Sequence, residues 1–134
     1  MGHTYYIGEN KEDAIKLDLM YENEKFIFNE ELIDGIIYAD VKEIAVMKLD
    51  AIFYGGRKKD FWDLHYLLFD ENFSLNELID LHARRFIYQH DRKELLNRLT
   101  DFDRADDEPD PVCRLGKSWD IIKLDLIDAA RVVL

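Results

Sequence analysis

The sequence predicts an α+β fold in which a small mixed or antiparallel β-sheet precedes a bundle of about five helices. Two patterns support this prediction. Apolar residues alternate with polar ones in the first forty residues, as in strands, and from Asp40 onward they recur every three or four residues, as in helices. With 134 residues, 48% of them hydrophobic, the chain is long enough to bury one core. We expect residues 1–40 to form the sheet and residues 41–134 to pack on it as a helical region, giving a single compact unit.

Three or four short strands are expected in the first forty residues. The alternation is clear at residues 15–19 and again around residues 26–28, and Gly35 introduces the apolar run IIYA. Asp18 takes an outward position on the first of these segments. Most side chains at such positions are merely solvated, so the pattern alone assigns Asp18 no role.

Five helices are expected in the rest of the chain, over residues 41–54, about 58–69, and from positions near 74, 91 and 118. We expect Asp40 to cap the first helix and the pair Gly55-Gly56 to end it. Ser74 and Glu77 have the spacing of a capping box, which marks the start of the third helix. Residues 101–111, DFDRADDEPDP, contain both prolines and six acids, so we expect an exposed loop there.

The charge balance limits the classes of partner. Eighteen basic against 29 acidic residues leave a net charge of −11, which opposes strong binding to nucleic acid or to anionic lipid. No apolar run approaches the roughly 18 residues that span a bilayer, and the first residues lack the features of a signal peptide. The single cysteine, Cys113, forms no intrachain disulfide, which is typical of a reducing compartment, and we expect a cytoplasmic protein.

Lys48 is the first candidate for a functional role. It shares the apolar stripe of its helix with Ile44 and Ile52, where an unpaired ammonium costs on the order of a few kcal/mol. The lysine therefore needs an anionic partner. A carboxylate of the fold and the phosphate of a ligand both meet this need, and the pattern does not separate them.

A second candidate lies at the start of the next helix. Arg57, Lys58 and Lys59 stand where free N–H groups and the helix dipole favour an anion, so they indicate a phosphate-binding site. The alternative is a solvated basic turn that balances Asp60 and Asp63. These two carboxylates are three positions apart and share one helical face, where they can cap the helix or act on a substrate. The pattern alone favours capping.

Four segments, taken in order, resemble a single family. They are AIKLDL; LIDGIIYADVKEIAVMKLDAI; KKDFWDLHYLL; and LTDFDRADDEPDP with GKSWDIIK. In content, order and spacing they are similar to the middle and C-terminal part of the nucleotidyltransferase toxins of the AbiEii/AbiGii abortive-infection type, which act in type IV toxin–antitoxin systems. The resemblance implies a nucleotidyltransferase fold, here with an incomplete sheet, followed by a helical region that helps to bind nucleotide.

The resemblance also implies roles for single residues. Asp18 falls where the fold has its third metal-binding carboxylate, and Lys48 matches the family lysine near the nucleotide phosphates. Lys59, Asp60 and Asp63 match a basic-Asp-x-x-Asp motif with a catalytic or nucleotide-positioning role. The implied reaction is the Mg²⁺-dependent transfer of a nucleotide from a nucleoside triphosphate to RNA or protein.

The sequence departs from the family in two places. Family members open with a Gly-Ser turn and a pair of carboxylates on a strand, and nothing before Asp18 supplies them. Where relatives often carry an arginine before the basic turn, this chain has Gly55. We therefore expect a truncated toxin that is inactive alone, whose site is completed by a second chain or by a missing N-terminal segment.

A non-catalytic module is the alternative to an enzyme. Such a module would bind a nucleotide, an antitoxin or a partner chain. A sheet that lacks its first strands leaves backbone groups unpaired and apolar surface uncovered, so we also expect a homo-oligomer formed through an exposed sheet edge.

Overall fold

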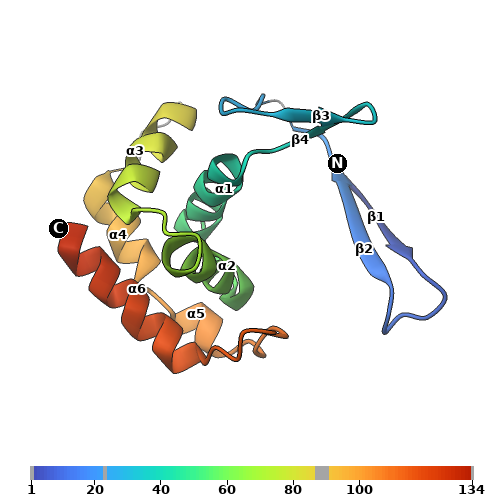
Figure 1. Cartoon of the computed structure of the whole chain (residues 1–134). Helices are drawn as coiled ribbons and strands as arrows, with labels where there is room; N and C mark the ends of the chain where they lie inside the picture. The colour runs from blue at the N-terminus through green and yellow to red at the C-terminus, as the bar shows by residue number, and fades with distance from the viewer. Residues whose placement is uncertain (1, 23, 87–90, 134) are drawn as a thin grey trace.

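The computed structural model describes residues 2–22, 24–86 and 91–133, and within them the fold is α+β, as predicted (Figure 1). The strands form two separate antiparallel hairpins, from β1 (Gly2–Ile7) and β2 (Ile15–Met20) and from β3 (Glu31–Ile33) and β4 (Ile36–Tyr38). The helices are α1 (Val41–Phe53), α2 (Lys58–Phe69), α3 (Leu75–Arg85), α4 (Arg92–Leu99), α5 (Asp103–Asp106) and α6 (Trp119–Val133). All except α5, a single turn, begin within a few residues of their predicted positions.

The β1–β2 hairpin has two chemically different faces. In its register Tyr5 pairs with Leu17 and Thr4 with Asp18, so successive pairs point to opposite sides. The apolar hairpin face consists of His3, Tyr5, Ile7, Ile15, Leu17 and Leu19. The polar hairpin face consists of Gly2, Thr4, Tyr6, Lys16, Asp18 and Met20.

Local signals set the helix ends. The Asp40 carboxylate accepts the backbone N–H of Lys42 at 2.8 Å and so caps α1. The Ser74 hydroxyl accepts the backbone N–H of Glu77 and caps α3, as the sequence predicts. After α1 the chain turns at Gly55, whose φ of 93° is a left-handed conformation that favours glycine.

Residues 101–111 are not the wholly exposed loop that the sequence predicts. They contain the turn α5, which buries Phe102 and Ala105. The Phe102 ring lies edge-on to the rings of Phe61 and Trp119, at centroid distances of 5.2 and 5.5 Å. Two apolar residues three positions apart are enough to hold one helical turn on a core, although the surrounding acids favour a loop.

The hydrophobic core is built from helical residues and from the adjoining Phe102. Leu49, Leu64, Leu78 and Leu99, from four different helices, are completely buried. Before α1, Phe28 packs against this core as a partly buried side chain. None of the described helices is long and apolar enough to cross a membrane.

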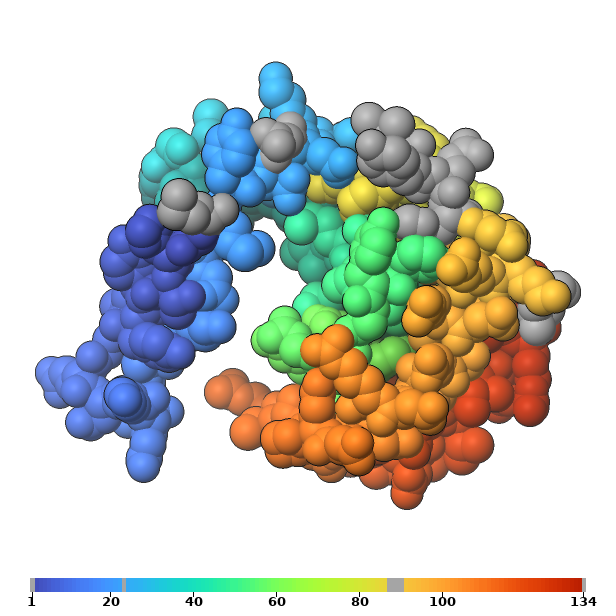
Figure 2. All heavy atoms as spheres, turned by 180° about the vertical axis from the view of Figure 1, so that it is seen from behind, coloured from blue at the N-terminus to red at the C-terminus, as the bar shows by residue number. Residues whose placement is uncertain are grey.

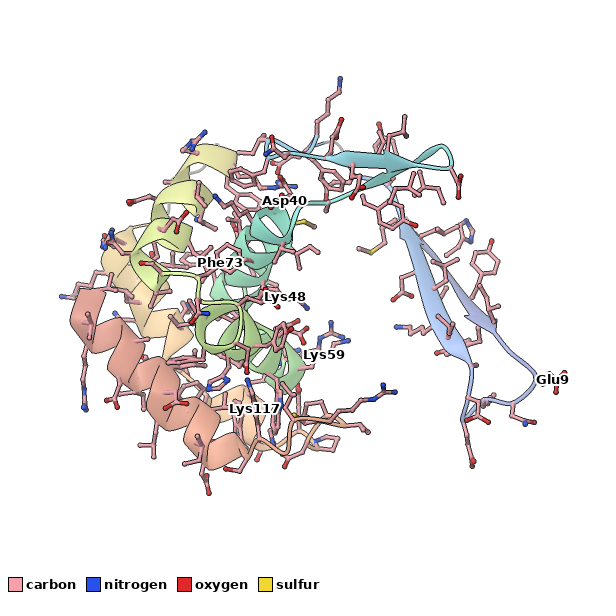
Figure 3. The ribbon with its side chains drawn as sticks, in the orientation of Figure 1. Glu9, Asp40, Lys48, Lys59, Phe73 and Lys117 are labelled. Atoms are coloured by element: carbon pink, nitrogen blue, oxygen red, sulfur yellow. The ribbon has the colours of Figure 1, made fainter. Side chains whose placement is uncertain are left out.

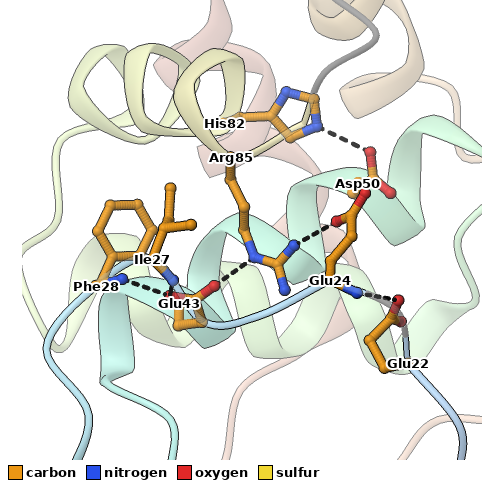
Figure 4. Close-up of polar contacts among 8 residues, drawn as sticks. All are labelled: Glu22, Glu24, Ile27, Phe28, Glu43, Asp50, His82 and Arg85. Carbon is orange, nitrogen blue, oxygen red and sulfur yellow. Dashed lines mark hydrogen bonds and ion pairs between the residues drawn. The ribbon is translucent and has the colours of Figure 1, made fainter.

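A buried carboxylate ties the segment between β2 and β3 to the helices (Figure 4). Glu43 of α1 is fully buried and accepts the backbone N–H groups of Ile27 and Phe28 at 3.1 and 2.9 Å. Its other oxygen accepts a hydrogen bond from the Arg85 guanidinium of α3, which also donates to Glu24 at 2.7 Å. The strands on either side of this segment form two separate hairpins, whereas the sequence predicts a single sheet.

The β1–β2 hairpin extends from the helices as an arm, and Figure 2 shows an open hollow between the two. Every residue of the four strands is exposed. The prediction that residues 1–40 and 41–134 form one compact unit stays a prediction.

Replacing Glu43 tests how strongly the buried carboxylate stabilises the fold. Glu43→Ala leaves the Arg85 guanidinium and two backbone N–H groups without their partner in a buried place. Breaking a buried ion pair on one side costs about 3–5 kcal/mol, and we expect a loss of that size in the free energy of unfolding measured by urea denaturation.

The matched control is Asp128→Ala. Asp128 and Arg131 form an ion pair at 3.4 Å in which both side chains are 72% exposed. Such a pair contributes less than about 1 kcal/mol. Equal losses in the two variants would contradict the role assigned to Glu43.

Candidate functional site

Helices α1 and α2 bring together three of the residues that the sequence singles out (Figure 3). The Lys48 ammonium lies 3.1 Å from an oxygen of Asp60 and 2.9 Å from an oxygen of Asp63. The lysine side chain is 26% exposed, so it is neither in the core nor free in solvent. The sequence allows either a carboxylate of the fold or a ligand phosphate as the partner of Lys48. The structure shows two carboxylates of the fold, Asp60 and Asp63.

The start of α2 explains why the two carboxylates face the same lysine. Asp60 and Asp63 are three positions apart on the helix and therefore project from one face. Asp60 also reaches back to accept the backbone N–H of Arg57 at 3.0 Å, which is the capping role that the sequence favours. Asp60 is buried, whereas the Asp63 side chain is 55% exposed.

The ion pairs shift the protonation equilibria of this cluster. Burial lowers the pKa of Lys48, but the hydrogen bonds from its ammonium to Asp63 and Asp60 outweigh this and raise the pKa above 10.5. Burial raises the pKa of Asp60, but the Arg57 N–H and the Lys48 ammonium outweigh it, so the pKa lies below 3.8. Lys48 and Asp60 are therefore both charged at neutral pH.

The three cations at the start of α2 do not act as one group. Arg57 and Lys59 are exposed, and Figure 3 shows Lys48 and Lys59 on the side of the helices that faces the hairpin arm. Lys58 is buried: its ammonium donates to the Asp110 carboxylate at 3.0 Å and lies 5.1 Å from the centre of the Trp119 ring. The ammonium of Lys58 is thus turned toward the loop before α6.

Asp18 lies on the polar hairpin face, across the hollow from α2. It accepts a hydrogen bond from the Thr4 hydroxyl at 2.6 Å and pairs with the Lys16 ammonium at 3.1 Å. The Thr4 hydroxyl and Lys16 lower the pKa of Asp18, and the charge of Lys59 adds to this effect. Asp18 and Lys59 are therefore near enough for their charges to interact.

A metal centre is not formed by the described residues. No three His, Cys, Asp or Glu side chains come together among residues 2–22, 24–86 and 91–133 in a way that would hold an ion. A surface pocket of about 490 Å³ beside α5 and α6 is lined by Asp101, Asp103, Asp106 and Asp120 with one lysine, and this acidic lining does not suit a phosphate.

Several polar contacts were not predicted from the sequence. His65 of α2 is buried between the Asp125 carboxylate at 2.7 Å and the Lys117 ammonium at 3.0 Å, so it connects α2 to α6 and to the preceding loop. Glu43 and Arg85 form the buried pair described above. Glu43 is three positions before the buried Val46 and lies on the same helix face, which favours a buried pair, but its partner is 42 positions away in the sequence.

Comparison with known proteins decides the family. A family model described as "Nucleotidyl transferase AbiEii toxin, Type IV TA system" matches residues 1–126. The chain belongs to this family. The resemblance seen in four sequence segments is thereby confirmed. Neither curated proteins nor solved structures gave a match.

The pKa of Asp60 makes the stability of this family member depend on pH. Because the folded-state pKa lies below 3.8, ionised Asp60 stabilises the fold above that pH, and the contribution is lost as the pH falls through the folded-state pKa. We expect the difference in free energy of unfolding between the natural chain and Asp60→Asn to shrink as the pH is lowered from 6 towards 3.

Lys48→Met provides the internal comparison. Without the lysine, the pKa of Asp60 should rise, and its contribution should be lost at a higher pH. Urea denaturation at a series of pH values measures both effects. A difference between the natural chain and Asp60→Asn that stays constant from pH 6 to pH 3 would contradict the assignment.

Proposed function

We propose that this chain supplies the phosphate-binding part of a nucleotidyltransferase site, and that groups from outside these residues complete the site. The observation that carries the proposal is the N-terminus of α2, where Arg57 and Lys59 are exposed. Arg57 and Lys48 share the partner Asp60, and Lys59 faces the arm that bears Asp18. Three cations stand here against two carboxylates, in a chain whose net charge is −11. A helix N-terminus with excess positive charge suits the phosphates of a nucleoside triphosphate.

Each residue has a distinct part in this proposal. Arg57 and Lys59 bind phosphate oxygens, together with the free N–H groups of the helix. Lys48 joins them by exchanging its exposed partner Asp63 for a phosphate oxygen while it keeps Asp60. Asp60 is a positioning residue, because its two oxygens fix the Lys48 ammonium and the Arg57 backbone. Lys58 has a structural role through Asp110 and does not bind nucleotide.

The metal ions that nucleotidyl transfer uses are not accommodated by the described residues alone. Asp18 is the single carboxylate on the polar hairpin face, and Thr4 and Lys16 already bind it. Two divalent ions require several carboxylate ligands. We therefore propose that the chain is inactive by itself and that a second chain or a further segment provides the missing carboxylates.

A binding role is the second candidate function, and the exposed strands favour it. The family belongs to type IV toxin–antitoxin systems, so an antitoxin is an expected partner. The hairpins present apolar side chains and unpaired strand edges, which are the features by which sheets recruit other chains. In this second role the chain binds a nucleotide at the start of α2 but does not catalyse its transfer.

Nucleotide binding tests the phosphate site. We expect the chain to bind ATP or GTP in isothermal titration calorimetry, and Lys59→Met to weaken the affinity about tenfold, as for the loss of one charge-assisted hydrogen bond. Lys93→Met is the matched control, because Lys93 is the second residue of α4 as Lys59 is of α2. Equal effects of the two substitutions, or no binding at all, would contradict the proposal.

Nucleotide transfer tests the missing carboxylates. With radiolabelled nucleoside triphosphates, MgCl₂ and total RNA or protein as acceptor, we expect the purified chain to transfer no label. Transfer that depends on Mg²⁺ and is abolished in Asp18→Ala would show that the chain is a complete enzyme and would overturn this part of the proposal.

A further inference from the structure

The segment before α6 is fastened to α2 at two points and carries a cysteine between them. At the first point the Asp110 carboxylate binds the ammonium of Lys58, the first residue of α2. At the second point the Lys117 ammonium lies 3.0 Å from Nδ1 of His65, further along the same helix. Cys113 lies between these points, and its partly buried side chain packs against the helical core. The thiol is therefore held beside α2.

A buried N–H group of α2 faces this thiol. Trp62 is only 7% exposed, and within the described part of the chain its Nε1–H is the buried side-chain group that lacks a hydrogen-bond partner. The Cys113 sulfur is near enough to interact with this N–H. A neutral thiol is a weak acceptor and leaves an indole N–H poorly satisfied. The place beside the sulfur therefore suits a negative charge or an additional oxygen atom.

Other groups around the sulfur act in the same direction. The backbone N–H groups of Lys117 and Leu115 interact with it from the turn that follows, and the Lys117 ammonium adds a positive charge. The indole N–H of Trp62 has the largest effect, and together these groups lower the pKa of Cys113 below 9.0 although partial burial opposes them. They favour the thiolate, which is the form in which cysteine reacts.

The sulfur is accessible to a small molecule. Cys113 is half-buried, and its neighbours Val112 and Arg114 are exposed. Oxidation of cysteine is selective for thiols of this kind, which are partly exposed and surrounded by hydrogen-bond donors and positive charge. The 134 residues contain no other cysteine with which the sulfur could form a disulfide.

We propose that Cys113 is an oxidation site, at which hydrogen peroxide converts the thiol to a sulfenic acid. The thiolate attacks one oxygen of the peroxide, so that an S–O bond forms while the O–O bond breaks. Sulfur gives up two electrons, and the second oxygen leaves as hydroxide, which takes a proton from the solvent. The oxygen added to sulfur accepts the Nε1–H of Trp62 and satisfies this buried group. This inference does not depend on the proposed nucleotide site.

The rate of oxidation tests the site. The natural chain is treated with hydrogen peroxide and dimedone, which traps sulfenic acids, and mass spectrometry follows the loss of unmodified chain and the adduct at Cys113. The same chain unfolded in urea is the reference, because its thiol has no fixed neighbours. At pH 7 we expect the folded chain to react faster, since more of its thiol is ionised. An equal or slower reaction of the folded chain would overturn the proposal, because partial burial by itself only shields a thiol.

Trp62→Phe tests the part of the buried N–H. It removes this N–H and keeps an aromatic ring against Trp119, on which Trp62 stacks at a centroid distance of 6.0 Å. We expect the rate at pH 7 to fall about tenfold, as for the loss of one charge-assisted hydrogen bond. Trp119→Phe is the matched control, because the indole N–H that it removes donates to Asp106 at 2.6 Å. The control should react like the natural chain.

Circular dichroism establishes that both variants are folded. An unchanged rate in Trp62→Phe, or an equal fall in both variants, would overturn the proposal.

The pH profile of the natural chain is a further test that needs no substitution. The rate follows the thiolate fraction, so it rises with pH and levels off above the pKa of Cys113. Because the neighbouring groups lower this pKa in the folded chain, the midpoint of the rise should lie at a lower pH in buffer than in urea. Midpoints that coincide, or a higher midpoint in the folded chain, would contradict the proposed thiolate site.

Discussion

The arrangement of this chain depends on one buried carboxylate. Glu43 is fully buried, and a charge in such a place is stable only when every oxygen is bonded. Arg85 of α3 and two backbone N–H groups of the segment before β3 meet this requirement. The same contacts therefore join α1 to α3 and decide where the chain leaves the helices to form its hairpins. The position of Asp18 relative to α2 follows from that departure.

The start of α2 attracts an anion from outside, but carboxylates of the fold already occupy part of it. Its free N–H groups and cations favour an anion, and the fold already provides two: Asp60 caps the helix, and Asp63 pairs with Lys48. A phosphate must compete with these carboxylates for the same ammonium. Asp60 is buried and held by the backbone, whereas Asp63 is half exposed and can be displaced at little cost. This difference in burial makes Lys48 available to a ligand without loss of the helix cap.

The sequence predicts the helices well because their signals are local. Asp40 and Ser74 cap the helices that follow them, and the three-and-four spacing of leucines marks the buried faces. The sequence does not identify the partner of Lys48, because Asp60 and a phosphate satisfy the same charge and the choice depends on how α1 packs on α2. The sequence groups Lys58 with its neighbours Arg57 and Lys59, yet Lys58 pairs with Asp110, 52 positions further along the chain. Such long-range pairings depend on tertiary packing, which residue spacing does not report.

Stability and function are distributed unequally over this chain. The helices have a shared core and are stable through it, whereas the strands expose every residue and gain little from one another. Asp18 is on one of these strands, so its position opposite Lys59 is only as well defined as the hairpin is stable. Whatever covers the apolar hairpin face also orders the polar face behind it, because both belong to the same two strands. We therefore expect the covering of the apolar hairpin face and the geometry of the proposed nucleotide site to be coupled through the hairpin, although no residue of that face belongs to the proposed site.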